Sequence, residues 1–222
     1  MDKVTVLVTC VGCVTSPSQI ESLRFNPEGR HLRIIGTDAV VPCIGQYTVD
    51  KFYQTPFGTD VEYVEKMLEI CSRESVDVVF PASHEEGLAL ARRRADFQKI
   101  GTTIAISKDS VLELAFNKKT AYQNLKNNNL PCPEFYVVHS VEEFKTAAFQ
   151  LGIDNKKIVM KPVLTRGGRG TRILTKSLNV HSILNEKPGG LEANYDEVVR
   201  ALNTIAPERF PELILMEYLP GE

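Results

Sequence analysis

Short apolar runs alternate with helix-period segments through the first half of the chain. Four runs are continuously or almost continuously apolar, at residues 4–9, 32–37, 76–80 and 103–106. Such runs are typical of strands in a parallel sheet that is covered on both faces. Amphipathic stretches with helical period, at residues 19–25 and 61–71, separate them. The pattern predicts a doubly wound parallel α/β domain over residues 1–106.

The second half has a different character, because its helices and strands do not alternate regularly. Helices are predicted at residues 118–127, at 141–151 and after Asn194, and strands at 134–138, 157–161, 171–175 and 213–216. Capping residues, glycines and prolines mark the ends of these segments. We expect an α+β domain over residues 107–222, so the chain as a whole is predicted to be α/β with two domains.

A polar segment, Ser83 to Glu86, follows the third apolar run. Its spacing is that of a capping box, which places a helix start just beyond the carboxyl end of a strand. Ligands of doubly wound sheets bind at this edge. The candidate substrate contacts at the strand ends are Gly12, Cys13, Ser83, His84, Glu85 and Glu86. His84 and Glu86 are equally explained as residues that satisfy the start of a helix.

A glycine-rich turn joins two strands of the second half. Its three glycines, Gly167, Gly168 and Gly170, are flanked by Arg166 and Arg169. Glycine lets backbone N–H groups approach an anion closely, and phosphate is the expected ligand. A tight β-turn also needs glycine for conformational reasons alone, so this motif is weak by itself.

Two lysines strengthen the case for an anion site. Lys161 ends the apolar strand that leads into the glycines, and Lys118 opens a predicted helix directly after Asn117. Taken alone, either lysine is more simply a solvated surface residue. Taken with the glycines, they give the hypothesis that the fold gathers both ammonium groups around one polyphosphate.

The final strand runs into a short segment, Glu217, Tyr218 and Leu219, followed by Pro220 and Gly221. An extended backbone with an apolar leucine beside it is suited to holding adenine. A strand that meets a Pro-Gly turn explains the same residues without any nucleotide.

Composition excludes several other classes of function. Of the 222 residues, 43% are apolar and 24% are charged, and the formal net charge is −2, which favours neither nucleic acid nor an acidic membrane as a partner. We find no apolar run long enough for a membrane span and no signal peptide, so we expect a cytoplasmic protein. The five cysteines are odd in number and mostly lie in apolar segments, so we expect no disulfides.

Together these elements resemble the ATP-grasp superfamily, and within it the branch of the carbamoyl phosphate synthase large subunit. The resemblance covers nearly the whole chain. The matching segments are residues 4–24, 35–38, 50–53, 77–81, 117–118, 161–162, 167–170 and 217–221. The order and spacing of the last three segments are specific, whereas the earlier ones are suggestive.

The resemblance implies an ATP site. Lys118 and Lys161 match the two basic residues that contact phosphate, and Asn117 replaces the usual aspartate before the first of them. Gly167, Gly168 and Gly170 match the hairpin that folds over the phosphates, with Arg169 helping it to close. The hinge that reads adenine corresponds to Glu217, Tyr218 and Leu219, where Leu219 packs on the base. The acidic residue that holds the ribose falls at Glu222 or, as we favour, at the next position.

The same resemblance implies Mg²⁺ as well as ATP, with metal ligands downstream of residue 222. The sequence therefore reads as a fragment of a ligase, by itself inactive and without catalytic or metal-ligating residues of its own. The intact enzyme would activate a carboxylate as an acylphosphate, which an amine or similar nucleophile then displaces. The partners implied are ATP and a small carboxylate-type substrate, and self-association into a homo-oligomer stays open.

The sequence admits three other interpretations. A nicotinamide-dependent oxidoreductase is disfavoured, because Gly12 is the only glycine in the first strand-to-helix turn, where a dinucleotide fingerprint requires three. A redox or zinc role for Cys10 and Cys13 is disfavoured because the other cysteines are isolated. A nucleotide-binding or metabolite-binding module without catalysis remains the alternative from another class.

Overall fold

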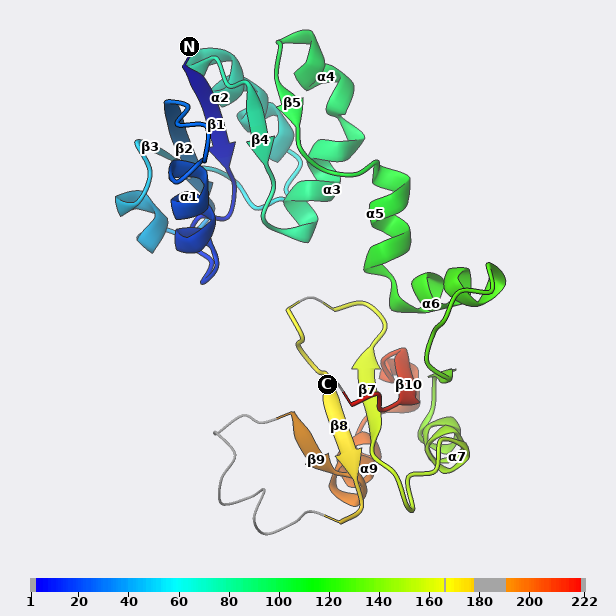
Figure 1. The fold of residues 1–222 in the computed structure, drawn as a ribbon. Helices are drawn as coiled ribbons and strands as arrows, with labels where there is room; N and C mark the ends of the chain where they lie inside the picture. Colours follow the sequence, from blue (N-terminus) through cyan, green and yellow to red (C-terminus); the bar gives the residue numbers. More distant parts are fainter. Residues whose placement is uncertain (1–2, 166, 178–190, 221–222) are drawn as a thin grey trace. The chain divides into compact units, whose positions relative to one another are not determined.

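The computed structural model describes residues 3–165, 167–177 and 191–220, and the chain divides into two compact units, Met1–Glu113 and Leu114–Glu222 (Figure 1). Arg166, Gly221 and Glu222 lie outside the described residues. Each unit has its own sheet and its own hydrophobic core. None of the helices in the described ranges is long and apolar enough to cross a bilayer.

The first unit is built on a parallel sheet of five strands. The strands are β1 (Val4–Val8), β2 (Leu32–Asp38), β3 (Lys51–Gln54), β4 (Val78–Phe80) and β5 (Thr103–Ile104). Their order across the sheet is β3-β2-β1-β4-β5, and every pair is parallel. Because the chain builds outwards from β1 in one direction and then from β4 in the other, the switch point lies between β1 and β4.

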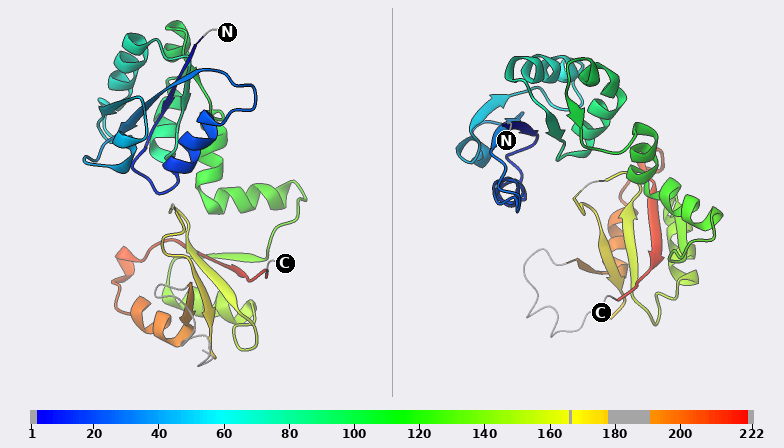
Figure 2. Two further views of the ribbon diagram at one scale, coloured as in Figure 1. Left: turned by 60° about the vertical axis from the view of Figure 1, so that its left-hand side comes forward. Right: turned by 45° about the horizontal axis from the view of Figure 1, so that its top comes forward.

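Helices cover both faces of this sheet. They are α1 (Ser16–Arg24), α2 (Tyr63–Glu74), α3 (His84–Arg92), α4 (Arg94–Lys99) and the short 3-10 helix η1 (Ile44–Tyr47). Val8 packs with Ile20 of α1, whereas its neighbour Leu7 packs with Met67 of α2 and Leu90 of α3. Alternate residues of one strand therefore reach the two opposite helical layers, as a strand buried on both faces requires. The helices on the two faces of the sheet are seen in Figure 2.

The predicted fold class is confirmed by this parallel sheet and by the second sheet that follows it. The start of the amphipathic helical stretch predicted over residues 61–71, which placed Val61 on its apolar face, is wrong, since α2 begins at Tyr63 and Val61 is 91% exposed. The fully buried ring of Tyr63 opens that face instead. Strand β3 was not predicted from the apolar pattern, because Lys51 and Gln54 at its two ends are exposed.

The second unit has a mixed sheet. Its strands are β6 (Phe135–Val138), β7 (Ile158–Pro162), β8 (Arg172–Thr175), β9 (Glu192–Asn194) and β10 (Leu213–Glu217), in the order β6-β10-β7-β8-β9. All neighbours are antiparallel except β8 and β9. The last described strand, β10, therefore lies between β6 and β7, one strand in from the edge of the sheet.

Helix α5 (Asp109–Phe116) spans the division between the two units. Helices α6 (Lys118–Asn127), α7 (Val141–Gln150) and α9 (Tyr195–Leu202) belong to the second unit, with the 3-10 helix η2 (Pro207–Arg209). The three helices start as the sequence predicts. The side chains of Asn117, Ser140 and Asn194 accept hydrogen bonds from the backbone N–H groups of Thr120, Glu143 and Glu197, each at 3.1 Å.

The core of the second unit lies on one face of its sheet. Helices α7 and α9 pack there against Ile158, Leu174 and Leu215 (Figure 2). On the opposite face, Tyr122 of α6 contacts Phe135 of β6 with ring centroids 5.5 Å apart. Lys161, one residue of the predicted nucleotide site, lies on that second face.

Candidate nucleotide site

Lys161 lies on the sheet face opposite the core of the second unit. Ile158 and Met160 of β7 pack with the core, so the alternation of a strand turns Val159 and Lys161 to the other side. Lys161 is half-buried, and its partner across the sheet is the buried Ile214. Among the described residues, no hydrogen bond or ion pair of the Lys161 ammonium group is found.

Lys118 is tied to the start of the glycine-rich loop. Its Nζ atom donates to the backbone oxygen of Thr165 at 3.1 Å and to the Thr165 hydroxyl at 3.2 Å. The backbone N–H of Lys118 donates to the backbone oxygen of Val163 at 3.2 Å. The helix that Asn117 caps therefore presents its first side chain to a loop more than forty positions further along the chain.

The two lysines lie close enough to interact. Burial lowers the pKa of the Lys118 ammonium group, and the positive charge of Lys161 lowers it further. The nearby carboxylate of Glu212 is bound to Lys119 at 2.8 Å and to His139 at 3.0 Å. Two like charges held together in this way favour the binding of an anion, because an anion relieves their repulsion.

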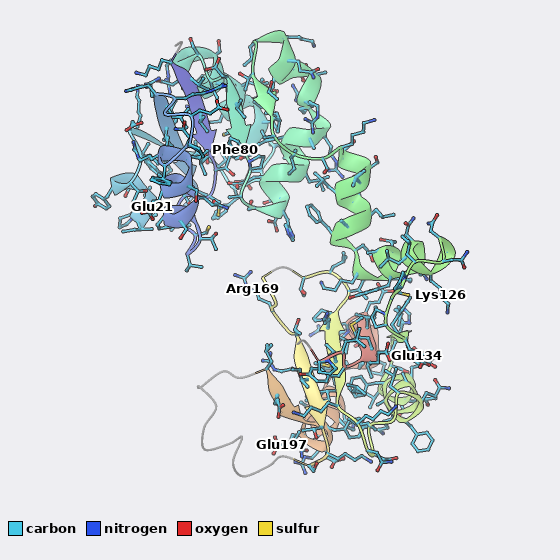
Figure 3. All side chains as sticks on the ribbon, viewed as in Figure 1. Glu21, Phe80, Lys126, Glu134, Arg169 and Glu197 are labelled. Atoms are coloured by element: carbon cyan, nitrogen blue, oxygen red, sulfur yellow. The ribbon has the colours of Figure 1, made fainter. Side chains whose placement is uncertain are left out.

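The loop between β7 and β8 has the backbone that its glycines allow. Gly167, Gly168 and Gly170 have φ angles of 58°, 70° and 72°, the left-handed region that other residues adopt only with strain. At Gly170 a side chain would also collide with Pro162, because a Cβ atom would lie 2.6 Å from the proline Cγ. Arg169 is exposed on this loop (Figure 3).

The end of β10 offers a mixed surface. Glu217 is bound to the segment before β6, since its N–H donates to the Glu134 oxygen at 3.0 Å and its carboxylate accepts from the Glu134 N–H at 3.1 Å. The Glu217 N–H is therefore not available to a base. Tyr218 and Leu219, with 37% and 62% of their surface exposed, are accessible.

The predicted phosphate and adenine residues lie along one pair of strands. Pro162, where the glycine-rich loop begins, is opposite Leu213, and Ile158 is opposite Glu217. The two ends are about 13 Å apart at the usual rise per residue of a strand, and Lys161 belongs to the same strand pair. An elongated ligand with a base at one end and phosphates at the other matches this arrangement.

In the first unit, Glu86 joins the ends of β1 and β4. Its Oε2 atom accepts hydrogen bonds from the Thr9 hydroxyl at 2.7 Å and from the Ser83 hydroxyl at 2.8 Å. Its N–H donates to the Ser83 hydroxyl at 3.3 Å. Glu86 is buried and burial raises the pKa of its carboxyl group. These contacts make Glu86 a positioning residue, whereas His84 is exposed and Glu85 is half-buried.

Gly12 lies in the turn after β1, against the end of β2. Its N–H donates to Oδ2 of Asp38 at 2.7 Å. A Cβ atom at this position would lie 2.8 Å from that oxygen and 2.9 Å from the Cβ of Cys43, so only glycine fits. The sequence predicts Gly12 as a candidate substrate contact, but nothing in it indicates Thr9 or Thr165.

A pocket of about 500 Å³ opens beside α1 at the carboxyl ends of β1 and β4. Its lining consists of Val8, Thr15, Ser18, Gln19, Ser22, Leu23, Phe80, Pro81 and Ala82. The exposed ring of Phe80 marks its position on β4 (Figure 3). Gly12, Cys13 and Ser83 precede or follow these lining residues in the chain, but they do not line the pocket themselves.

Within residues 3–165, 167–177 and 191–220, no group of three or more His, Cys, Asp and Glu side chains is arranged to hold a metal ion.

The fold of the chain, a parallel α/β unit followed by a mixed sheet, is shared with several solved structures. Residues 12–105 match the family model described as PylC-like, N-terminal domain.

Three solved structures illustrate the likeness. N5-carboxyaminoimidazole synthetase from Staphylococcus aureus, complexed with ADP, is 15% identical with a TM-score of 0.57, over 97% of this chain and 47% of that one. L-amino acid ligase from Bacillus licheniformis is 14% identical with a TM-score of 0.57, over 98% of this chain and 45% of that one. The biotin carboxylase domain of 2-oxoglutarate carboxylase from Hydrogenobacter thermophilus, in complex with MgADP, ADP and bicarbonate, is 17% identical with a TM-score of 0.56, over 97% and 44%.

The chain thus spans about half the length of the solved structures that it matches. At this level of identity the likeness establishes the fold.

Proposed function

We propose that the chain forms the nucleotide-binding part of an ATP-dependent ligase that joins a carboxylate to an amine or a similar nucleophile. The observation that carries the proposal is the pair Lys118 and Lys161, two lysines whose charges interact at the base of a glycine-rich loop. The similarity to N5-carboxyaminoimidazole synthetase and L-amino acid ligase supports it.

In this proposal the second unit binds ATP through one strand pair. Lys161 and Lys118 contact the phosphates, and the N–H groups of Gly167, Gly168 and Gly170 cover them, with Arg169 closing the loop. Glu217, Tyr218 and Leu219 form the adenine end, where the accessible Leu219 packs on the base. The Glu217 N–H stays bound to Glu134, so the base is read by the backbone beyond it.

Mg²⁺ would neutralise charge on the transferring phosphoryl group when it is bound. The described residues contain no cluster of three metal-ligating side chains. We propose, as the family resemblance implies, that the Mg²⁺ ligands lie downstream of residue 222. Lys118 and Lys161 supply positive charge from this chain.

The reaction proposed for the complete enzyme has two steps. A carboxylate oxygen attacks the γ-phosphorus of ATP, the bond to the bridging oxygen breaks, and ADP leaves with an acylphosphate formed. An amine then attacks the acyl carbon and inorganic phosphate leaves. The lysines and loop N–H groups stabilise the negative charge of the first transition state, because they are already in place when that charge develops.

The first unit would hold the carboxylate substrate at the carboxyl edge of its sheet. We propose Gly12, Cys13, Ser83, His84 and Glu85 as contacts, with Glu86 fixing the position of Ser83. A narrower specificity like that of carbamoyl phosphate synthase stays a prediction, because the family model that matches this unit is the PylC-like one.

The path of the carboxylate oxygen tests the reaction type. The complete enzyme would be incubated with ATP, Mg²⁺, an amine and a panel of carboxylates labelled with a heavy oxygen isotope. An acylphosphate transfers one labelled oxygen from the carboxylate to inorganic phosphate, which mass spectrometry detects. ATP consumption without label in the phosphate would contradict the ligase proposal. ATP binding without any consumption would favour a non-catalytic nucleotide-binding module.

A further inference from the structure

Three of the five cysteines of the chain lie around one turn, the turn that follows β1. Cys10 and Cys13 occupy its first and fourth positions, with Val11 and Gly12 between them. The Cys13 N–H donates to the Cys10 backbone oxygen at 3.1 Å, which closes a β-turn. Cys43 approaches the turn from η1 and faces Gly12.

Hydrogen bonds from the start of α1 and to the end of β2 fix the conformation of the turn. The N–H and hydroxyl of Ser16, at the start of α1, both donate to the backbone oxygen of Cys13, at 3.1 and 2.9 Å. The Ser16 hydroxyl also donates to the Val11 backbone oxygen. The Val11 N–H donates in turn to the Thr37 backbone oxygen at 3.1 Å. The relative positions of the two cysteines are therefore set by the fold.

These positions are compatible with the Cα separation of a disulfide. The first and fourth Cα atoms of a β-turn are less than about 7 Å apart, and bridged cysteines have Cα atoms about 4.4 to 6.8 Å apart. The Cys10 side chain already interacts with that of Cys13. Both thiols are free and half-buried. Cys71 lies in the core of the first unit and Cys132 in the second unit, and neither takes part.

We propose that Cys10 and Cys13 form a reversible disulfide across this turn, by exchange with a small disulfide such as oxidised glutathione. The sequence alone favoured incidental thiols, because spacing does not show whether two side chains meet. The closed turn and the thiol interaction supply that information.

The two cysteines have different roles in the exchange. Burial and the neighbouring carboxylates of Glu86 and Asp38 raise the pKa of the Cys10 thiol to about 12. Cys10 is therefore a poor first nucleophile at neutral pH, since the thiolate is the reactive form. The Cys13 thiolate attacks one sulfur of oxidised glutathione, the glutathione S–S bond breaks, and one glutathione thiolate leaves.

Cys10 then loses its proton to solvent and attacks the Cys13 sulfur. The mixed S–S bond breaks and a second glutathione leaves. The protein loses two hydrogen atoms in total, and one molecule of oxidised glutathione becomes two of the reduced form. The product crosslinks the turn that also places the Gly12 N–H against Asp38, at the carboxyl edge of the sheet. The chemistry does not depend on the nucleotide site.

Glutathione buffers of graded redox ratio test the proposal on the purified chain. After acid quenching and alkylation of the remaining thiols, intact mass and peptide mapping report which sulfurs are bridged. The unsubstituted chain should lose two hydrogen masses through a Cys10 to Cys13 link, and dithiothreitol should reverse the change. Cys132→Ser, a control in the second unit, should behave identically.

Two variants check the order of the steps. Cys10→Ser should trap one glutathionyl group on Cys13, whereas Cys13→Ser should form neither the link nor an adduct at Cys10. Circular dichroism establishes that each variant is folded. Cys10 has a positive φ of 51°, which glycine adopts without strain, so Cys10→Gly serves as a second version of the first variant. A link from Cys43 to either cysteine, or no bridge at any redox ratio, would overturn the proposal.

Discussion

The ammonium group of Lys118 is bound by Thr165, whose backbone oxygen and hydroxyl lie 3.1 and 3.2 Å from Nζ. The residue that opens α6 is thus connected to the start of the glycine-rich loop. In the proposed site this contact has a function, because it fixes one phosphate-binding charge at the place where the loop leaves β7. Thr165 is then a positioning residue, acting through Lys118.

Removing the Thr165 hydroxyl should weaken nucleotide binding. Thr165→Val takes away one hydrogen bond to a charged group while keeping the side-chain shape, so we expect a loss of about 1 kcal/mol, or about fivefold in ATP affinity. Calorimetric titration of the complete enzyme with an ATP analogue measures it. Thr165→Ser should restore affinity. In a Lys118→Met background, Thr165→Val should have no further effect, and additive losses would exclude the positioning role.

Lys161→Ala should weaken ATP binding more strongly. The charge-assisted contact that it removes contributes about 1.5 to 3 kcal/mol, equivalent to a loss of roughly ten- to a hundredfold in affinity. Lys156→Ala is the matched control, because Lys156 is exposed and lies beyond the other end of β7. The ATP affinity of the Lys156→Ala enzyme should be unchanged. Equal ATP affinity in Lys161→Ala and the unsubstituted enzyme would remove Lys161 from the site.

Gly170→Ala and Gly167→Ala separate two roles of glycine in the loop. Both positions have a positive φ, but a Cβ atom at Gly170 would collide with Pro162, whereas one at Gly167 has no neighbour within 4 Å. We expect left-handed strain of about 1 to 2 kcal/mol in both variants and a further cost of about 1 to 3 kcal/mol at Gly170. Denaturant unfolding measures the difference, and equal unfolding free energies would contradict it.

Glu74 makes the stability of the first unit depend on acid pH. Hydrogen bonds from Lys51, Tyr53 and Arg33 lower the pKa of its buried carboxyl group from 4.5 to about 2. A carboxyl group with a lowered pKa in the folded state stabilises the fold above its unfolded pKa and loses that contribution as the pH falls through the folded value. The stabilisation should therefore be complete above about pH 5 and disappear towards pH 2.

Glu74→Gln should reduce the free energy of unfolding by about 2 kcal/mol at pH 7. The difference from the unsubstituted protein should shrink steadily between pH 5 and pH 2, as denaturant titrations at each pH can establish. Glu69→Gln on the same helix is the control, because the Glu69 pair with Lys66 is exposed and contributes little. A Glu74→Gln deficit that stays constant over this range would contradict the assignment.

The 222-residue chain alone should bind ATP weakly and with little dependence on Mg²⁺. The described residues contain no cluster of three metal-ligating side chains, and the similar solved structures are about twice as long. Equilibrium dialysis with labelled ATP, with and without Mg²⁺, measures both quantities. Tight binding that requires Mg²⁺ would contradict this expectation and would place the metal ligands within these residues.

Local patterns in the sequence were sufficient to predict much of the fold. Continuous apolar runs predicted the parallel strands. The side chains of Asn117, Ser140 and Asn194 predicted three helix starts, because they accept hydrogen bonds from backbone N–H groups in the first turn of the helix. Such signals act over a few neighbouring residues, so they survive in the sequence. The apolar pattern did not predict strand β3, because this strand is short and exposed at both ends.

The sequence by itself determined which residues could bind an anion, because glycine spacing and lysine positions are local properties. Only the tertiary structure decided that Lys118 and Lys161 interact, that Thr165 binds Lys118 and that Glu86 commits its carboxylate to Thr9 and Ser83. The physical reason is that these contacts join residues far apart in the chain. Their geometry depends on strand order and register, which neither composition nor periodicity specifies.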